Sequence, residues 1–159
     1  MSEKLVVVPE LCSGCSICEL VCAIKHFGAN NPKKSAIRVH TTYPNPAVNK
    51  PVVCSQCEEP ACAEACPTDA LQRVDGLVTL DEDKCIFCYD CVEACTFEAM
   101  YVHRDYGLPI KCDMCGGDPQ CVGKCPKQAI RLVAEAAVAG LDLRDNVLSG
   151  DQVAALERS

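Results

Sequence analysis

Short apolar runs, separated by polar turns, recur along the chain. Residues 5–8 and 77–80 are rich in valine and leucine, and each run leads into a segment rich in cysteine. Three further apolar runs begin just after such segments, at Ala70, Ala99 and Ala129. Apolar runs of about four to eight residues, bounded by turn residues, are typical of β-strands. The pattern therefore predicts a repeated unit of a short strand, a cysteine loop with a helical turn, and a second short strand.

Two segments depart from this repeat. Pro67 and Pro126 follow the last cysteine of their segments and are expected to end the short helix there, because proline disfavours a helical conformation in the residue before it. No proline follows Cys22, so a longer helix is expected after it. Residues 28–50 are rich in asparagine, proline and lysine and are expected to form an insertion, in which residues 36–41 form a strand.

The last part of the chain has a different composition. Residues 132–140 are rich in alanine, which favours a helix. Ser149 stands three residues before Gln152 and ahead of a further apolar run, as in a capping box at the start of a helix. We therefore expect residues 132–159 to form a helical tail outside the cysteine-rich core.

Sixteen cysteines dominate the chemistry of this chain of 159 residues. They form four groups of four, and in every group two residues separate the first two cysteines and three separate the last two. The middle spacing is two residues in groups one and three, four in group two and five in group four. This spacing matches the bacterial ferredoxin pattern for 4Fe-4S clusters. The groups are Cys12, Cys15, Cys18 and Cys22 (group one), Cys54, Cys57, Cys62 and Cys66 (group two), Cys85, Cys88, Cys91 and Cys95 (group three), and Cys112, Cys115, Cys121 and Cys125 (group four).

Composition supports a protein that metal holds together. Aromatic residues make up 4% of the chain and tryptophan is absent, so little material is available for an apolar core. Metal binding that the unfolded chain cannot match contributes folding free energy. The apoprotein is therefore expected to be largely unfolded.

Charge and apolar patterning exclude several classes of protein. The formal net charge of -7 disfavours nucleic-acid binding. The apolar run at residues 5–8 is too short for a secretory signal peptide, and no run is long enough for a membrane span. We expect a cytoplasmic protein whose thiols stay reduced until they bind metal.

Zinc and disulfides are the alternatives for so many cysteines. Four zinc ions would also use all of them, but structural zinc sites usually combine two separate CxxC pairs, whereas each group here has a third closely spaced cysteine. Because the cysteines suffice for four clusters, His26, His40 and His103 are expected to be surface residues. Lys84 and Lys111 precede the first cysteines of groups three and four, and are expected either to raise the potential of a cluster or to lie in solvent.

With these motifs, residues 5–131 resemble the four-cluster ferredoxin-like subunits of molybdenum and tungsten oxidoreductases, such as the electron-transfer subunit of dimethyl sulfoxide reductase. In its compact length and tail the chain is similar to the small subunit of bacterial tungsten aldehyde oxidoreductases. The resemblance implies a non-catalytic subunit that relays single electrons through four 4Fe-4S clusters. The implied partners are a molybdenum- or tungsten-pterin catalytic subunit and a flavin-containing subunit or ferredoxin.

The same resemblance implies an α+β fold, a tandem bacterial-ferredoxin-like arrangement of two lobes with the inner lobe inserted in the outer one. The outer lobe would comprise residues 1–50 and 108–131, the inner lobe residues 51–107, and the helical extension residues 132–159. The outer lobe would face the catalytic subunit, and the inner lobe would face the point where electrons enter or leave.

In that family the first cysteine group pairs with the fourth and the second with the third. Carried over to this chain, each cluster takes the first three cysteines of one group and the last cysteine of the partner group. The resemblance thus implies site 1 (Cys12, Cys15, Cys18 and Cys125), site 2 (Cys112, Cys115, Cys121 and Cys22), site 3 (Cys54, Cys57, Cys62 and Cys95) and site 4 (Cys85, Cys88, Cys91 and Cys66).

Two other functions are compatible with the sequence. A free soluble polyferredoxin would carry electrons between enzymes and dock only transiently, and a zinc-binding protein with four-cysteine sites would mediate interactions. The tail separates the first of these from an oxidoreductase subunit, because a diffusing carrier has little use for it. A tail of this kind could dock a catalytic subunit, join copies of the chain, or cover one lobe.

Overall fold

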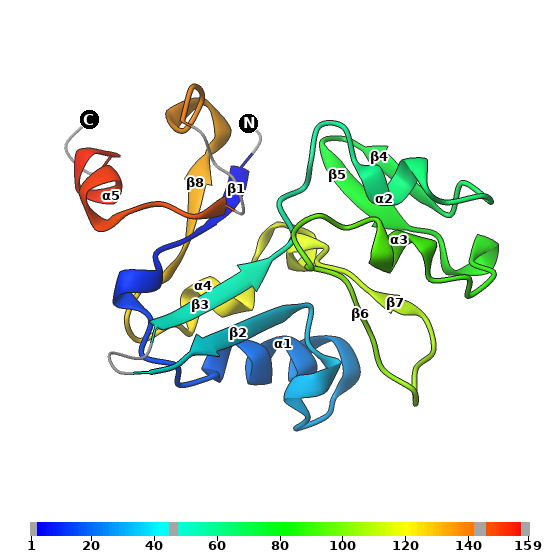
Figure 1. Ribbon diagram of the computed structural model, residues 1–159, viewed down its shortest axis with the longest axis horizontal. Helices are drawn as coiled ribbons and strands as arrows, with labels where there is room; N and C mark the ends of the chain where they lie inside the picture. Colours follow the sequence, from blue (N-terminus) through cyan, green and yellow to red (C-terminus); the bar gives the residue numbers. More distant parts are fainter. Residues whose placement is uncertain (1–2, 45–47, 142–145, 157–159) are drawn as a thin grey trace.

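A computed structural model describes residues 3–44, 48–141 and 146–156 of the chain. In this part of the protein the strands form four separate antiparallel pairs, connected by short helices and loops (Figure 1). The pairs are β1 (Glu3–Val7) with β8 (Ile130–Ala134), β2 (Ile37–Thr42) with β3 (Val48–Val53), β4 (Leu71–Val74) with β5 (Leu77–Leu80), and β6 (Tyr101–Val102) with β7 (Pro109–Ile110). The molecule is thus a small mixed α and β protein.

Each cysteine group carries one α-helix, and a further helix lies near the C-terminus. The α-helices are α1 (Ile17–Phe27), α2 (Ala61–Glu64), α3 (Asp90–Glu93), α4 (Gln120–Gly123) and α5 (Gly150–Leu156). Short 3-10 turns occupy Pro9–Leu11, Pro32–Lys34, Glu82–Lys84, Met114–Gly117 and Glu135–Ala137. Within the described residues, no helix has both the length and the apolar character that a membrane crossing requires.

The helices of the cysteine groups contact one another in two pairs. Helix α1 of group one packs against α4 of group four, and α2 of group two packs against α3 of group three. Figure 1 shows α2, α3, β4 and β5 together on one side of the molecule, and α1, α4, β1 and β8 on the other. The division into an inner and an outer lobe remains a prediction, but the helix contacts follow the group pairing on which it was based.

Helix α1 is longer than α2, α3 and α4, as the missing proline after Cys22 predicted. Gly28 ends it in the left-handed conformation, with φ of 60°, and donates its N–H to the Ile24 carbonyl over 2.9 Å. The buried Glu19 carboxylate accepts the Val39 N–H of β2 at 3.1 Å. The helix is thereby tied to the β2–β3 hairpin, in which the strand expected at residues 36–41 is confirmed as β2.

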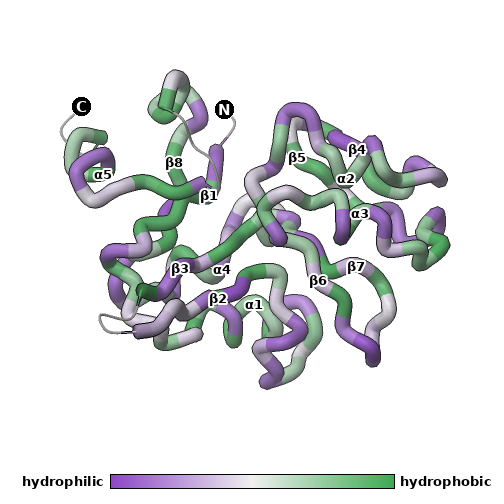
Figure 2. The backbone as a smooth tube through the Cα atoms, in the orientation of Figure 1, coloured by the Kyte–Doolittle hydropathy of each residue, from purple (hydrophilic) through white to green (hydrophobic). Residues whose placement is uncertain are grey.

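Strand β1 is buried on both faces. Its residues alternate between two apolar clusters, as the side chains of a strand must, because successive side chains point to opposite faces. Leu5 and Val7 join the core that contains Ile37, Val53 and Ile130. Figure 2 shows apolar residues along most of the partner strand β8. The two-sided burial explains why residues 5–8 form a continuous apolar run instead of an alternating one.

The C-terminal tail covers the second face of β1. Leu148 is fully buried and donates its N–H to the Val7 carbonyl over 2.9 Å. The predicted capping box is confirmed, because Ser149 N–H donates to Gln152 Oε1 at 2.8 Å and Gln152 N–H donates to Ser149 Oγ at 3.3 Å. Val138, Leu148 and Val153 of the tail form one apolar cluster with Val6 and Val8.

The start of the C-terminal segment contains less helix than expected, and two of the expected segment boundaries fall within strand pairs. The helix expected at residues 132–140 is wrong, since β8 continues to Ala134 and a 3-10 turn follows. Pairing with β1 outweighs the weak helix preference of alanine there. The boundary between residues 50 and 51 falls inside β3, and that between residues 107 and 108 divides the β6–β7 pair. Residues 1–2, 45–47, 142–145 and 157–159 of the expected segments lie outside the described residues.

Candidate metal centres

The four cysteine loops share one backbone feature. The residue just before the second cysteine of each group is in the left-handed region, with φ of 72° at Gly14, 48° at Gln56, 60° at Phe87 and 57° at Met114. Three of these residues are not glycine, although this conformation is disfavoured for residues with a side chain. The same local turn therefore forms four times from different side chains, as expected for a structural repeat.

The third cysteine of each group occupies the same place in its helix. It is the second helical residue in α1, α2, α3 and α4. In groups one and three, which have the short middle spacing, the residues preceding the helix are the left-handed Ser16 and Tyr89. In groups two and four the longer spacing brings Pro60 and Pro119 to that position in an extended conformation. The different spacings thus lead to equivalent placements of the third cysteine.

Three cavities are each lined by four cysteines from two different groups. In each case three cysteines come from one group and the fourth is the last cysteine of another. The cysteines that share a cavity are Cys12, Cys15, Cys18 and Cys125, then Cys112, Cys115, Cys121 and Cys22, and finally Cys85, Cys88, Cys91 and Cys66. The structure thus brings together the same residues that the resemblance assigned to sites 1, 2 and 4.

The cysteines assigned to site 3 influence one another's pKa values, which shows that they lie close together. Burial, followed by the nearby charges of Cys54 and Cys95, raises the pKa of Cys62 to about 11. Burial and the same two neighbours also raise the pKa of Cys57. These effects show that the four residues lie near one another, with Cys95 contributed by group three. Cys62 also acts on Cys91 of site 4, and Cys54 acts on Cys112 of site 2.

The spacing of the sulfur atoms argues against zinc. Four sulfurs around one zinc ion, at about 2.3 Å from the metal, lie roughly 3.8 Å from one another. Among the described residues, which include all the cysteines, no three cysteine sulfurs lie within 4.8 Å of one another. All sixteen cysteines are free, so disulfides do not account for them. The four-thiol cavities therefore fit a multi-iron cluster, whose cysteine ligands bind separate iron atoms.

Burial disfavours the thiolate form of several of these cysteines. Desolvation is the largest cause that raises the pKa of Cys18 and of Cys121 to about 12, and that of Cys91 to about 11. Neighbouring cysteine charges raise all three further. A cluster ligand is a deprotonated sulfur. The positive charge of bound iron would offset both the burial and the mutual repulsion of the thiolates.

Backbone N–H groups point at the sulfur of the last cysteine in several groups. Ala99 N–H donates to Cys95 Sγ at 3.4 Å, and Ala129 N–H donates to Cys125 Sγ at 3.3 Å. In both cases the residue before the alanine has a left-handed conformation, which turns the alanine N–H back towards the cysteine. In group one the donor is Ala36, whose N–H reaches Cys22 Sγ at 3.4 Å. Such bonds to sulfur influence the potential of a cluster.

Gln56 is a buried residue that sequence reasoning missed. Its side chain is inside the protein, with 4% of the residue exposed. Its Nε2 donates to the Cys112 carbonyl at 2.8 Å, and its Oε1 accepts the Val78 N–H at 2.9 Å and Lys111 Nζ at 3.2 Å. Gln56 therefore joins the group-two loop to the group-four loop and to β5. A glutamine between two cysteines gives no sequence signal of burial.

The two lysines beside first cysteines differ in their surroundings. Lys111 Nζ also donates to the Cys112 carbonyl at 3.1 Å, and its charge lowers the pKa of Cys57, Cys62 and Cys112 against the larger effect of burial. Lys84 is half exposed and pairs with Asp81 at 3.2 Å. Lys111 thus lies near cysteine thiols, and its effect on a cluster potential remains a prediction. Lys84 is a solvated lysine, as the second expectation had it.

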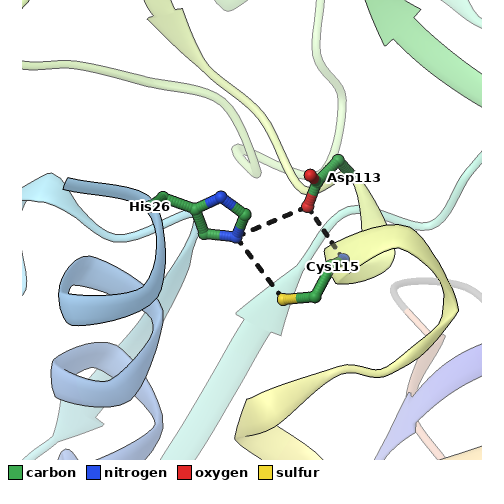
Figure 3. A group of neighbouring side chains, drawn as sticks. All are labelled: His26, Asp113 and Cys115. Carbon is green, nitrogen blue, oxygen red and sulfur yellow. Dashed lines mark hydrogen bonds and ion pairs between the residues drawn. The ribbon is translucent and has the colours of Figure 1, made fainter. Parts of the chain in front are cut away.

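The three histidines also differ. His40 is exposed, as expected. His103 is partly buried, with its side chain 13% exposed and its Nε2 3.4 Å from Asn31 Nδ2. His26 is a surface residue, but its ring contacts Cys115 of group four (Figure 3). His26 follows Cys22 by four residues and therefore lies on the same face of helix α1, one turn further along. This spacing is the feature of the sequence that could have indicated its proximity to the cysteines of site 2.

A family model for a 4Fe-4S dicluster domain matches residues 47–135, which carry cysteine groups two, three and four. The chain belongs to this family. Together with sixteen free cysteines, membership identifies an iron-sulfur electron-transfer protein that binds 4Fe-4S clusters. Group one lies outside the matched residues, yet its cysteines line cavities with those of group four.

Several curated proteins are similar to this member of the dicluster family. The polyferredoxin-like subunit of an aliphatic sulfonate oxidoreductase from Pyrococcus furiosus is 41% identical over 123 residues, covering 76% of this chain and 70% of the relative. An iron-sulfur protein from Rhodospirillum rubrum is 34% identical over 152 residues, covering 79% of this chain and 78% of the relative. These relatives agree with an electron-transfer role.

Among solved structures, the active site complex BamBC of benzoyl coenzyme A reductase, in complex with 1,5 dienoyl-CoA, contains a chain of similar fold. The TM-score is 0.50 at 23% identity, and the match covers 83% of this chain and 75% of the other. At this identity the likeness concerns the fold alone.

Proposed function

We propose that this protein is a non-catalytic subunit of an oxidoreductase complex and relays single electrons through four 4Fe-4S clusters. The clusters would be held at sites 1 to 4 with the crossed ligation described above. The observation that carries the proposal is the lining of three separate cavities by four cysteines each, always three from one group and one from another. Sulfur spacing that is too wide for zinc supports the same conclusion.

The chain's own residues would bind the clusters and control their surroundings. A bound 4Fe-4S cluster supplies one-electron chemistry at a potential that depends on hydrogen bonds to sulfur, charge and solvent exposure. The cysteine thiolates would hold the iron, and the backbone N–H groups of Ala36, Ala99 and Ala129 would stabilise negative charge on the sulfurs. Gln56 and Lys111 would fix the distance between sites 2 and 3, since they connect the two loops.

The proposed partner on one side is a catalytic subunit with a molybdenum- or tungsten-pterin centre, such as an aldehyde oxidoreductase. The proposed partner on the other side is a flavin-containing subunit or a ferredoxin. The relative from Pyrococcus furiosus supports the placement in a complex, because it is described as a subunit of an oxidoreductase. The proposed location is the cytoplasm, where thiols stay reduced until they bind metal.

The cofactor content can be tested directly. The chain is produced under anaerobic conditions and analysed for iron, sulfide and zinc, and its reduced form is examined by spin resonance. We expect about sixteen iron atoms per chain, a brown colour, and the signals of reduced 4Fe-4S clusters. A colourless protein with about four zinc ions would contradict the proposal.

The subunit role needs a second experiment. The tagged chain is purified anaerobically from its native source, and the associated polypeptides are analysed for molybdenum, tungsten and flavin. We expect a stoichiometric complex with a large subunit that contains a pterin-bound metal. A metal-free set of partners would contradict the proposed catalytic subunit without affecting the assignment of the clusters.

One observation favours the alternative of a free polyferredoxin. The described part of the tail is packed on β1, with Val138, Leu148 and Val153 buried against the strand. Because these side chains are buried within this chain, the presence of the tail no longer indicates that a partner subunit docks there. If the native protein elutes at the size of a single chain with its clusters intact, the carrier function is the correct one.

A further inference from the structure

A histidine, an aspartate and a cysteine meet where the end of helix α1 faces the loop of cysteine group four (Figure 3). His26 lies in the last turn of α1, and Asp113 and Cys115 lie in the loop that follows Cys112. His26 Nε2 is 3.4 Å from Cys115 Sγ and 3.5 Å from Asp113 Oδ1. One nitrogen of the ring therefore faces both a sulfur and a carboxylate oxygen.

The surroundings of this nitrogen define its role in hydrogen bonding. A carboxylate and a thiolate are both acceptors, so a stable contact requires that Nε2 carries the proton and donates it. Asp113 Oδ1 already accepts the backbone N–H of Cys115 at a short 2.9 Å, and its distance to the ring is long for an N–H···O bond. Sulfur accepts over longer distances, so the ring's N–H is directed to Cys115 Sγ. Asp113 holds the loop and attracts the ring.

A separate metal ion is a competing explanation for the same three residues. Their ligand atoms all lie within 4.8 Å of one another. Cys115, however, lines one cavity together with Cys22, Cys112 and Cys121, so on the proposed ligation its sulfur binds a cluster iron. A separate ion would then have only His26 and Asp113 as ligands of its own. His26 and Asp113 line the same cavity. The geometry thus suits a side chain in the wall of the cavity that acts on the cluster ligand.

We propose that His26 is a positioning residue that donates a hydrogen bond from Nε2 to the Cys115 sulfur and thereby raises the reduction potential of the cluster at site 2. The inference rests on the proposed function, because it requires a cluster at that site. A reduced cluster carries one more negative charge than an oxidised one, and a hydrogen bond to a ligand sulfur stabilises the more negative state. The imidazole adds a donor to the backbone N–H groups, such as that of Met114 at Cys112 Sγ, 3.4 Å away.

The test compares two His26 variants with a histidine control. His26→Leu keeps the bulk of the side chain but removes the donor, and His26→Gln retains an amide donor. His40→Leu changes a histidine exposed on β2. Each holoprotein is analysed for iron and then titrated with a reductant while spin resonance or film voltammetry follows the clusters.

We expect His26→Leu to retain its iron and to lower one reduction potential, with about a tenfold change in that reduction equilibrium, which corresponds to about 59 mV for a one-electron couple. His26→Gln is expected to restore at least part of the shift, and His40→Leu to change nothing. The proposal is overturned if His26→Leu keeps its iron and all its potentials, or if His40→Leu produces the same shift. It is also overturned if both His26 variants lose one cluster's worth of iron, since His26 would then be a ligand.

These outcomes are separate from those that test the proposed function. A wild-type protein without iron-sulfur clusters would contradict the function itself. A wild-type protein with clusters whose potentials do not respond to His26 would contradict only this inference.

Discussion

Gly14 shows how closely a cysteine loop is fitted to its surroundings. Its φ of 72° places it in the left-handed region, and a Cβ at this position would lie 2.7 Å from Asn49 Oδ1. Asn49 is held by Thr41, whose hydroxyl donates to the same oxygen over 2.8 Å. At the equivalent position the other loops use Gln56, Phe87 and Met114, so the conformation alone does not require glycine, whereas the close approach of Asn49 does.

We expect Gly14→Ala to destabilise the holoprotein more than Gly28→Ala does. Gly28 is also left-handed, with φ of 60°, but a Cβ there would meet nothing within 4 Å. The control therefore carries only the conformational cost of about 1–2 kcal/mol, whereas Gly14→Ala adds a steric clash. Thermal unfolding followed by circular dichroism at equal iron content compares them. Equal losses for the two variants would show that Asn49 moves away freely.

Gln56 is the second residue whose role can be isolated. Gln56→Met removes its hydrogen bonds and keeps its length, and methionine already occupies the equivalent left-handed position at Met114. The Val78 N–H then loses its partner in a buried position, which costs about 1–3 kcal/mol. Gln72→Met, at an exposed position on β4, serves as the control. Chemical unfolding of the holoproteins should show a loss for Gln56→Met alone, and similar stability in both variants would contradict the bridging role.

At the scale of elements, strand β1 joins the cysteine-rich core to the C-terminal tail. One face belongs to the core that contains Cys18, Cys22 and Cys121, and the other face is covered by the tail. Glu10, just after β1, accepts the Gly150 N–H at the start of α5 over 2.7 Å. The two ends of the described chain are therefore joined by side-chain packing and by hydrogen bonds.

We expect Leu148→Ala to lower the free energy of unfolding by about 2–5 kcal/mol, because a fully buried leucine leaves a cavity when it is truncated. Leu141→Ala is the matched control, since Leu141 is 36% exposed and should contribute within about 0.5 kcal/mol. Denaturant unfolding of the two holoproteins measures the difference. A neutral Leu148→Ala variant would mean that the tail does not pack on β1 in solution.

The elements that follow from local sequence were predictable, and those that depend on distant pairing were not. The strand at 36–41, the longer helix after Cys22, and the Ser149–Gln152 capping box all have local causes and are confirmed. The extension of β8 to Ala134 depends on pairing with residues far away in the chain, which alanine content cannot reveal. The cysteines of the candidate sites were evident from spacing, whereas Gln56 and the contact of His26 with Cys115 arise only when distant loops meet.

At the scale of the whole molecule, the proposed ligation links cysteine groups that lie far apart. Cys22 lines a cavity with three cysteines of group four, and Cys125 lines another with three cysteines of group one. Each of these two groups would thus complete the cluster site of the other. The packing of α1 against α4 is the structural counterpart of this exchange.

A reciprocal pair of variants tests the exchange. In Cys22→Ala, we expect the thiols of Cys112, Cys115 and Cys121 to become reactive, because they lose the fourth ligand of site 2. In Cys125→Ala, the thiols of site 1 should become reactive in their place. Alkylation of the native proteins followed by peptide mass spectrometry identifies the exposed thiols. If each variant exposes the cysteines of its own group, the crossed ligation is wrong.

The pairing of β1 with β8 also has a consequence for biosynthesis. A chain emerges from the ribosome N-terminus first, and domains generally fold as units during synthesis. Strand β1 and group one cannot pair until residues 112–134 have been synthesised. Groups two and three lie next to each other in the sequence, and both emerge before residues 112–134. On the proposed ligation, sites 3 and 4 can be filled while the chain is still being made, and sites 1 and 2 can close only near its completion. The cysteines of group one are therefore synthesised first but are among the last to bind a cluster. During this interval their thiols depend on a reducing environment, and they still need a supply of iron when the chain is complete.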